Sequence, residues 1–395
     1  MKEQPLYSRR LAFTERMYLA TLRPDGRGLT IQFAFHGPGS LDPKALELAL
    51  ANAAVVHPGA RLRLQGRLGW TRWVSDGPTP RLREIPRSEG VTCPEREQKR
   101  LDPRTGPTVE LLWIRGEPGC LIFRCLHSVM DGAGLLLFAE DVFKALRREE
   151  PKGINSSLCD SEFLIDTVGK RFRKTIPWNS PALFEAPQDS ASTNHEVRVL
   201  KVLPKPSSNL VARLAVYLAK TWGNDQRLRF MVPSNARNYR REILSTANLS
   251  YPLFFELDAH ANSEVVQKEI FQSLVKKDFL RLDPLELKGR WIPLGVLRLM
   301  LDAIYIMQRI SRKGFCSIFI SHIQFPQAKN FCSPAFETTR IEYIPAREFK
   351  FGTISIVSVV LGGVHDIVVF APRNWAKLDD LRRVAEGIKE VLEEN

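Results

Sequence analysis

Apolar and polar residues alternate along several stretches of the chain, in the two-residue rhythm that is typical of β-strands. The earliest clear case is the stretch 28–37, which reads GLTIQFAFHG. Two apolar runs lie within residues 108–127 and are joined by Gly-Glu-Pro-Gly, which indicates a pair of adjacent antiparallel strands. Strand-like patterns recur in both halves of the chain, at residues 60–74, 195–203, 226–233, 316–325, 351–363 and 364–372.

Other stretches carry apolar residues at the three- and four-residue spacing of an amphipathic helix. In residues 40–58, Ser40 or Asp42 is a candidate N-cap, Pro43 fits the first turn and Pro58 ends the pattern. The same spacing predicts further helices within residues 132–150, 207–223 and 378–395.

Strands and helices therefore occur in both halves, and the segment between them has a different composition. Ser, Pro, Asn and Gly are frequent from residue 151 to residue 194, which predicts a looser crossover there. We predict two lobes, residues 1–175 and residues 176–395, each with mixed α/β structure. The hairpin signals argue against a parallel dinucleotide-binding sheet.

Charge narrows the choice of partners. The 395 residues include 57 Lys and Arg and 44 Asp and Glu, which gives a net charge of +13. Such a charge suits polyanions, either nucleic acid or a phosphate-bearing small molecule or acidic protein. Because no nucleic-acid-binding motif accompanies the charge, we expect no nucleic acid partner.

Cysteine usage and hydropathy bear on the compartment. The six cysteines show no spacing typical of a metal site, and we interpret them as buried, reduced thiols of a cytoplasmic protein: Cys93, Cys120, Cys125, Cys159, Cys316 and Cys332. The N-terminal stretch has no apolar core of the signal-peptide kind. Residues 291–310 form the most apolar long segment, but Arg298 and Asp302 interrupt it. We expect an amphipathic helix there, packed on the core or touching an apolar substrate or a membrane surface, rather than a transmembrane span.

The candidate chemistry lies in residues 124–134, which read RCLHSVMDGAG. His127 ends an apolar strand, Asp131 follows four residues later, and Gly132 and Gly134 precede a predicted helix. We expect the two glycines to adopt backbone angles that other residues avoid. A histidine at a strand end can act as a general base, because its ordinary pKa of about 6.5 lies near neutrality. The aspartate either orients the imidazole ring or locks the turn by pairing with an arginine.

The stretch HSVMDG matches the H-x-x-x-D-G motif of the coenzyme A-dependent acyltransferase superfamily. That superfamily includes chloramphenicol acetyltransferase, the condensation domains of peptide synthetases, and wax-ester and polyketide-associated acyltransferases. Residues 30–64 and 231–253 also resemble family segments, so the resemblance extends loosely over the whole chain. It implies two chloramphenicol acetyltransferase-like lobes, each a mixed, largely antiparallel sheet with helices, and an active-site tunnel between them.

The resemblance also implies roles for individual residues. His127 matches the histidine that takes a proton from the acceptor as it attacks an acyl thioester. Asp131 matches an aspartate with a structural role, and Arg237 matches the arginine that pairs with it. Gly132 matches the glycine that keeps the channel open. Asn248 matches a family asparagine and is a candidate to line the channel or to stabilise the oxyanion.

This sequence departs from the family pattern at three places. Leu126 stands where many members have a second histidine, as it does in several ester-forming branches. Ala247 replaces the glycine before the family asparagine. The DFGWG motif of the plant branch is absent, and the nearest text is KFGTISIV at 350–357. These departures favour a stand-alone bacterial enzyme that forms esters.

We therefore predict a natural-product acyltransferase that moves an acyl group from a coenzyme A or carrier-protein thioester to a hydroxyl of a lipid or natural-product acceptor. One alternative is a free-standing condensation enzyme that forms an amide between two carrier-bound substrates, with an amine as the acceptor. Another is a catalytically silent family member that binds a carrier protein. No bound cofactor or metal is expected, because the sequence has no motif for ATP, NAD or zinc.

The remaining alternatives concern the groups around the thioester. Backbone N–H groups of the glycine turn, Ser321 or Thr353 are candidates to stabilise the oxyanion that forms on the thioester carbonyl. No covalent acyl-enzyme is required. A Cys125–His127 nucleophile is the alternative, because period-two alternation places both residues on one strand face.

Overall fold

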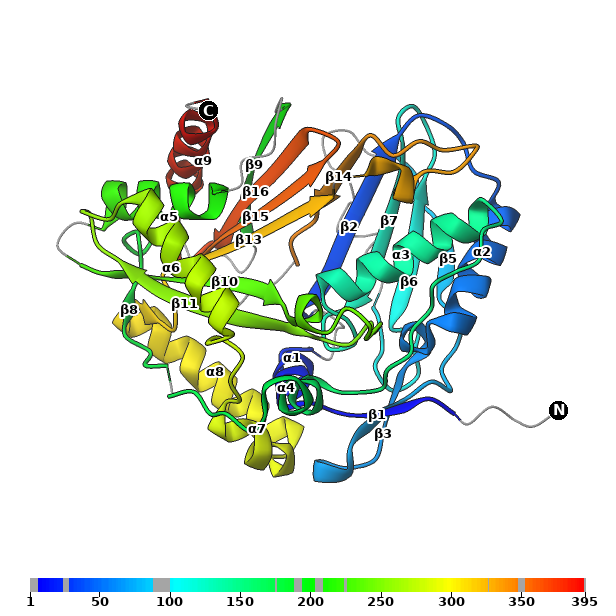
Figure 1. Cartoon of the computed structure of the whole chain (residues 1–395), viewed down its shortest axis with the longest axis horizontal. Helices are drawn as coiled ribbons and strands as arrows, with labels where there is room; N and C mark the ends of the chain where they lie inside the picture. Colours follow the sequence, from blue (N-terminus) through cyan, green and yellow to red (C-terminus); the bar gives the residue numbers. More distant parts are fainter. Residues whose placement is uncertain are drawn as a thin grey trace.

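The structure is a computed structural model that describes residues 6–23, 28–87, 100–174, 176–187, 194–202, 209–223, 226–325, 327–346 and 352–393. In this part of the chain the two largest sheets lie side by side, with helices on their outer surfaces (Figure 1). The mixed α/β class and the two-lobed arrangement predicted from the sequence are confirmed.

The first sheet has the strand order β14-β2-β7-β6-β5. Its strands are β14 (Arg340–Tyr343), β2 (Thr30–Gly37), β7 (Gly119–Leu126), β6 (Val109–Ile114) and β5 (Arg81–Glu84). All neighbours pair antiparallel except β5 and β6, which are parallel. The hairpin β6–β7 is the one that the Gly-Glu-Pro-Gly segment predicts.

The second sheet has the order β11-β10-β13-β15-β16-β9. Its strands are β11 (Ser250–Leu257), β10 (Leu228–Asn235), β13 (Ile318–Phe325), β15 (Ile354–Leu361), β16 (Val364–Pro372) and β9 (Asn194–Val202). Strand β13 is parallel to both β10 and β15, whereas the other pairs are antiparallel. Shorter pairings join β1 (Ser8–Arg10), β4 (Arg72–Val74) and β3 (Arg63–Gln65), and also β12 (Lys313–Gly314) and β8 (Ser180–Pro181).

The described helices are α1 (Phe13–Ala20), α2 (Pro43–Val56), α3 (Gly132–Leu146), α4 (Asp160–Val168), α5 (Leu210–Trp222), α6 (Ser263–Lys276), α7 (Pro284–Lys288), α8 (Leu294–Ser311) and α9 (Leu378–Glu393). Of the two N-cap candidates for α2, the structure selects Asp42, which accepts a hydrogen bond from the Ala45 amide at 3.1 Å. The sequence patterns do not predict α1, α4, α6 or α7. Helix α4 lies inside the segment that the sequence assigns to a loose crossover.

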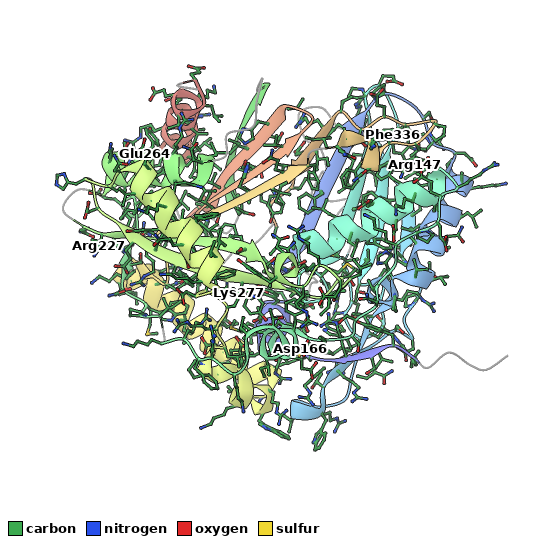
Figure 2. All side chains as sticks on the ribbon, in the orientation of Figure 1. Arg147, Asp166, Arg227, Glu264, Lys277 and Phe336 are labelled. Carbon is green, nitrogen blue, oxygen red and sulfur yellow. The ribbon has the colours of Figure 1, made fainter. Side chains whose placement is uncertain are left out.

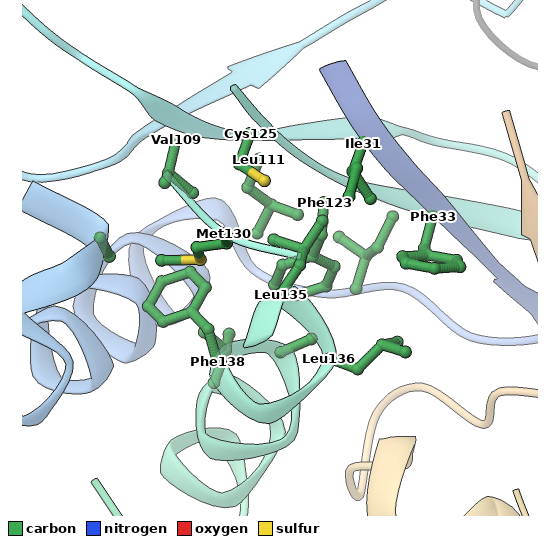
Figure 3. Packing of buried hydrophobic residues seen from close by; sticks show 14 of the residues in the cluster. Ile31, Phe33, Val109, Leu111, Phe123, Cys125, Met130, Leu135, Leu136 and Phe138 are labelled. Atoms are coloured by element: carbon green, nitrogen blue, oxygen red, sulfur yellow. The ribbon is translucent and has the colours of Figure 1, made fainter. Parts of the chain in front are cut away.

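Period-two alternation divides the core into layers. On the first sheet Phe33 and Phe123 face α2 and α3, where Phe123 lies 6.4 Å from Phe138 between ring centroids (Figure 3). On the second sheet Ile356 faces α5 and α9, whereas its neighbour Val357 belongs to the core of the first lobe. The inner face of the second sheet is thus part of the core that supports the first sheet.

One segment of the second half crosses to the first sheet. Strand β14 pairs antiparallel with β2, with Ile341 opposite Phe35. Ahead of it, the segment 328–337 crosses the C-terminal end of α3, where Arg147 donates to the Cys332 carbonyl at 2.6 Å and Phe336 lies nearby (Figure 2). The predicted boundary at residue 175 stays a prediction, and Lys174 is the last described residue before it.

Candidate functional site

His127 lies where β7 ends and a short turn leads into α3. Its backbone N–H donates to the Leu29 carbonyl at 3.0 Å, which ties the turn to the start of β2. The imidazole is half-buried between α1 and the segment that precedes β11. The site therefore contains residues from both halves of the chain.

Asp131 is the N-cap of α3 and also the main link between the halves. One carboxylate oxygen accepts from the Gly134 N–H at 2.7 Å, and the other accepts from the Leu249 N–H at 2.8 Å and the Ser250 hydroxyl at 3.0 Å. The Arg237 guanidinium donates to both oxygens, at 3.0 and 3.1 Å. Burial alone would raise the pKa of Asp131, but the charge and hydrogen bonds of Arg237 and the two amides outweigh it and hold the pKa below its ordinary value.

Arg237 is itself fixed by the second half of the chain. It donates to the Ser245 carbonyl at 2.9 Å, to Asn235 at 3.1 Å and to the Ala247 carbonyl. Only 12% of its side chain is exposed, and 2% of that of Asp131. The pair that the resemblance implies is therefore present as a buried, bidentate ion pair. None of the hydrogen bonds given above for the Asp131 carboxylate comes from the His127 imidazole.

The prediction that Gly132 and Gly134 adopt backbone angles that other residues avoid is wrong. Neither Gly132 nor Gly134 is among the residues with positive φ, so the turn does not need unusual backbone angles. Gly134 is needed for another reason, because a Cβ there would lie 2.4 Å from the Thr246 carbonyl oxygen. A Cβ on Gly132 would meet only the Phe33 ring, at 3.5 Å, which is an ordinary contact.

The imidazole is oriented by Asn248. The Nδ1 atom of His127 lies 3.1 Å from Oδ1 of Asn248, and the Asn248 Nδ2 donates to Glu15 at 3.2 Å. A carboxylate only accepts, so the amide NH₂ of Asn248 must face Glu15 and its oxygen must face the ring. Nδ1 of His127 must then carry the proton, and Nε2 keeps its lone pair.

Glu15 is a site residue that the sequence did not reveal. It lies in the first turn of α1 with 1% of its side chain exposed, and it is paired with Arg9 at 2.5 Å. Its oxygens also accept from the Ala12 amide at 3.2 Å and from the Trp73 indole at 3.1 Å. Arg9 lies in β1 and Trp73 in β4, so two strands of the small sheet β1-β4-β3 hold the carboxylate that orients Asn248. No spacing in the sequence points to this contact.

Tyr18, also on α1, covers one face of the imidazole. The ring centroids of Tyr18 and His127 lie 4.2 Å apart, with 26° between the planes. Burial raises the pKa of Tyr18, so its phenol stays protonated. Burial also lowers the pKa of His127, although its backbone hydrogen bonding, the Asp131 charge and Asn248 oppose the shift. The histidine is therefore neutral at pH 7.

The two candidate hydroxyls on the second sheet have different environments. Ser321 is half-buried on β13 opposite Val357, and so lies on the sheet face that adjoins the first lobe. Thr353 is buried beside Cys316, and its hydroxyl donates to the Ser317 carbonyl at 3.0 Å. In the part of the chain that the structure describes, neither hydroxyl makes a hydrogen bond with His127.

Four of the five described cysteines are buried, free thiols as predicted, and one is not. Cys120, Cys125, Cys159 and Cys316 are free and buried, whereas Cys332 is half-buried, and Cys93 lies outside the described residues. Burial and the Asp131 charge raise the pKa of Cys125, so its thiol is not ionised at neutral pH. The alternative of a Cys125 nucleophile has no support from this environment.

Among the described residues, no group of three or more His, Cys, Asp or Glu residues could hold a metal ion. No described helix is long and apolar enough to cross a membrane.

The whole chain was compared with known proteins. No family model and no curated protein matches the sequence. Solved structures match over 98% of this chain. One is the starter condensation domain of rhizomide synthetase with C8-CoA and Leu-SNAC (14% identity, 95% of that chain, TM-score 0.66).

Two further matches come from other megasynthases. The condensation domain of Monacolin K polyketide synthase is 13% identical over 97% of its length, with a TM-score of 0.65. The epimerization domain from the third module of tyrocidine synthetase B is 14% identical over 97% of its length, with a TM-score of 0.61. The chain therefore has the two-lobed fold of condensation domains, as the resemblance implied.

Proposed function

We propose that the protein is an acyltransferase in which Nε2 of His127 is the general base. The observation that carries the proposal is the contact of His127 Nδ1 with Asn248, which fixes the ring in the tautomer with a basic Nε2. Because burial lowers the pKa of His127, the base is unprotonated at neutral pH. In this scheme Asn248 and Glu15 are positioning residues, and Asp131, Gly132 and Arg237 support the site.

The donor that we propose is an acyl thioester on coenzyme A or on the phosphopantetheine arm of a carrier protein, with no bound cofactor. A structural neighbour holds C8-CoA and Leu-SNAC, which supports a thioester donor. The net charge of +13 suits a phosphate-bearing donor and an acidic carrier protein. The free, buried cysteines support a reducing compartment such as the cytoplasm.

In the proposed reaction the acceptor hydroxyl attacks the thioester carbonyl carbon while Nε2 of His127 takes the hydroxyl proton. The tetrahedral intermediate carries its negative charge on the former carbonyl oxygen. It collapses by breaking the carbon–sulfur bond, and the leaving thiolate takes the proton back from the imidazolium. The products are an ester and a free thiol, and no acyl-enzyme forms.

The oxyanion requires a hydrogen-bond donor, and the contacts narrow the candidates. The Gly134 amide already donates to Asp131, and the Thr353 hydroxyl already donates to the Ser317 carbonyl. Ser321 and the amide of Gly132, at the first turn of α3, are the candidates that these bonds leave available. A tunnel between the lobes that admits donor and acceptor is part of this proposal.

Ester formation on a lipid or natural-product alcohol is the first choice. Leu126 occupies the position of the second histidine that several ester-forming branches also lack. Amide formation by a free-standing condensation enzyme is the second, because the neighbours are condensation domains and one binds Leu-SNAC. A silent member that only binds a carrier protein is the third. The ordered Glu15–Asn248–His127 chain supports an active protein over a silent one.

The test is thiol release from octanoyl-coenzyme A and from acyl carrier proteins, with pooled alcohols and amines as acceptors. Wild type, His127→Ala and the matched control His260→Ala are compared. His260 is exposed in the turn after β11, so its loss should leave the rate unchanged. Acceptor-dependent release that only His127→Ala abolishes would support the proposal. Equal release by His127→Ala and wild type would contradict it.

A further inference from the structure

Helix α8 has apolar residues on its solvent side. Its outward residues are largely exposed: Val296 46%, Leu299 70%, Met300 45%, Ile306 55%, Met307 60% and Ile310 80%. We call these six residues the α8 outer face. Exposed apolar side chains are ordinary when single, but a continuous row along one helix marks an interaction surface. In Figure 1 α8 lies along the lower edge of the molecule.

The fold does not need this face for its own core. The opposite side of α8 supplies the contacts with the protein: Leu297 is 3% exposed and packs with Phe13 and Ala20 of α1. Arg298 also turns inward, where it donates to the Ala20 carbonyl at 3.2 Å and to the Leu22 carbonyl. Of the two residues that interrupt the apolar segment in the sequence, Arg298 is therefore on the inner side, and Asp302 is half-buried.

Aromatic residues extend the surface beyond the start of α8. Trp291 is 47% exposed and Trp70 is 77% exposed, and their rings meet edge to face with centroids 5.9 Å apart. Leu68, in the same turn as Trp70, is 46% exposed. Tryptophan is the side chain most favoured at the boundary between lipid and water.

The charge around the surface is basic. Residues 288–313 contain six basic residues and one acidic residue, although Arg298 and Arg312 donate to backbone carbonyls of the protein itself. Lys288 is exposed before the N-terminal end of α8, and Arg309 and Lys313 are exposed at its C-terminal end. An apolar helix face with basic residues at its ends complements an anionic lipid surface.

We propose that the α8 outer face, with Trp70 and Trp291, docks on an anionic lipid bilayer with the helix parallel to the membrane plane. The outer face runs from Val296 to Ile310 and is about 21 Å long, and its apolar side chains enter the interface between headgroups and acyl chains. The charge argues against a second copy of this chain on the face, because a two-fold contact would bring the basic ends of two helices together. This binding does not depend on the proposed function.

The test is cosedimentation of the full chain with large unilamellar vesicles. One set of vesicles contains phosphatidylcholine alone, and the other contains about 30% phosphatidylglycerol, whose headgroups are anionic. We expect at least about tenfold tighter binding to the anionic vesicles, and weaker binding as salt rises. Leu299→Glu/Ile310→Glu should reduce binding by at least about 30-fold, and Arg309→Gln/Lys313→Gln should reduce it about 30-fold on anionic vesicles only.

The matched control places the same charges on another exposed apolar pair. Leu48 and Val55 on α2 are 63% and 71% exposed, so Leu48→Glu/Val55→Glu should bind vesicles like wild type. His127→Ala should also bind like wild type, which separates this proposal from the transfer chemistry. Quenching of tryptophan fluorescence by brominated lipid, reduced in Trp70→Phe/Trp291→Phe, tests the same face without added charge.

Three outcomes would overturn the proposal. The first is no sedimentation with either vesicle. The second is an equal loss of binding in the α2 control pair. The third is a wild-type dimer in analytical ultracentrifugation that Leu299→Glu/Ile310→Glu converts to a monomer, because a second copy would then cover the face.

Discussion

The ion pair between Asp131 and Arg237 gives the most direct test of the structural argument. Asp131→Ala removes the acceptor for the two Arg237 nitrogens, for the Gly134 and Leu249 amides and for the Ser250 hydroxyl. The arginine stays in place through its carbonyl partners and is left as a buried charge without its counterion. We expect the free energy of unfolding to fall by about 3–5 kcal/mol at pH 7.

A matched control separates the ion pair from the helix cap. Asp42 is the N-cap of α2 as Asp131 is of α3, but Asp42 is exposed and accepts from the Ala45 amide. Asp42→Ala should cost only about 1 kcal/mol, the usual value of a lost N-cap. The excess loss in Asp131→Ala then measures the buried pair and the second-half contacts.

The assay is urea denaturation followed by tryptophan fluorescence, at neutral and at acidic pH. Because the folded-state pKa of Asp131 lies below its ordinary value, its stabilisation is present above about pH 4 and is lost as the pH falls further. The difference between wild type and Asp131→Ala should therefore shrink in acid. If Asp131→Ala unfolds within about 1 kcal/mol of wild type at pH 7, the structural role of the pair is refuted.

Three further predictions follow from the site. Gly134→Ala should destabilise the protein by at least about 1 kcal/mol, because its Cβ would lie 2.4 Å from the Thr246 carbonyl oxygen. Gly132→Ala should change the free energy of unfolding by no more than about 0.5 kcal/mol. Urea denaturation of both variants checks this, and equal effects would contradict it. The acid limb of kcat/KM for thiol release should lie below pH 6.5, since burial lowers the pKa of the general base His127; a limb above pH 7 would count against this assignment. Of the five described cysteines only the half-buried Cys332 should react readily with iodoacetamide in the folded protein, as peptide mass mapping would show, and rapid alkylation of Cys125 would be inconsistent with its buried, protonated thiol.

The sequence predicts the fold where the pattern is local. Strands β2, β7, β15 and β16 lie where the sequence has strand-like apolar patterns, and nearly all their residues are buried. The cap and Pro43 of α2 lie at the predicted start. The sequence does not predict α1, because eight residues with a charged pair in the middle give little periodic signal. It also misses α4, whose Ser- and Asp-containing start resembles a loop composition.

The sequence likewise predicts the local part of the candidate site and not its long-range contacts. His127 and Asp131 lie in one short segment, so the motif is visible in the sequence. The orientation of the imidazole depends on Glu15 and Asn248, which are 233 residues apart in the chain. Only the folded arrangement of the small sheet, α1 and the second half brings them together, and a buried glutamate looks in sequence like any surface glutamate.

The position of β14 has a consequence for the order in which the protein is made. Among the described strands, β14 (Arg340–Tyr343) alone pairs with one edge of β2, and about 300 residues separate the two strands in the chain. During synthesis at roughly 5–20 residues per second, that edge waits on the order of 15–60 s before its neighbour emerges. Over that interval the edge strand, with Ile31, Phe33 and Phe35 on one side, is open to pairing with other chains. We expect the nascent first lobe to need protection of this edge, by chaperones or by early cover from other segments, until residues 340–343 have been made.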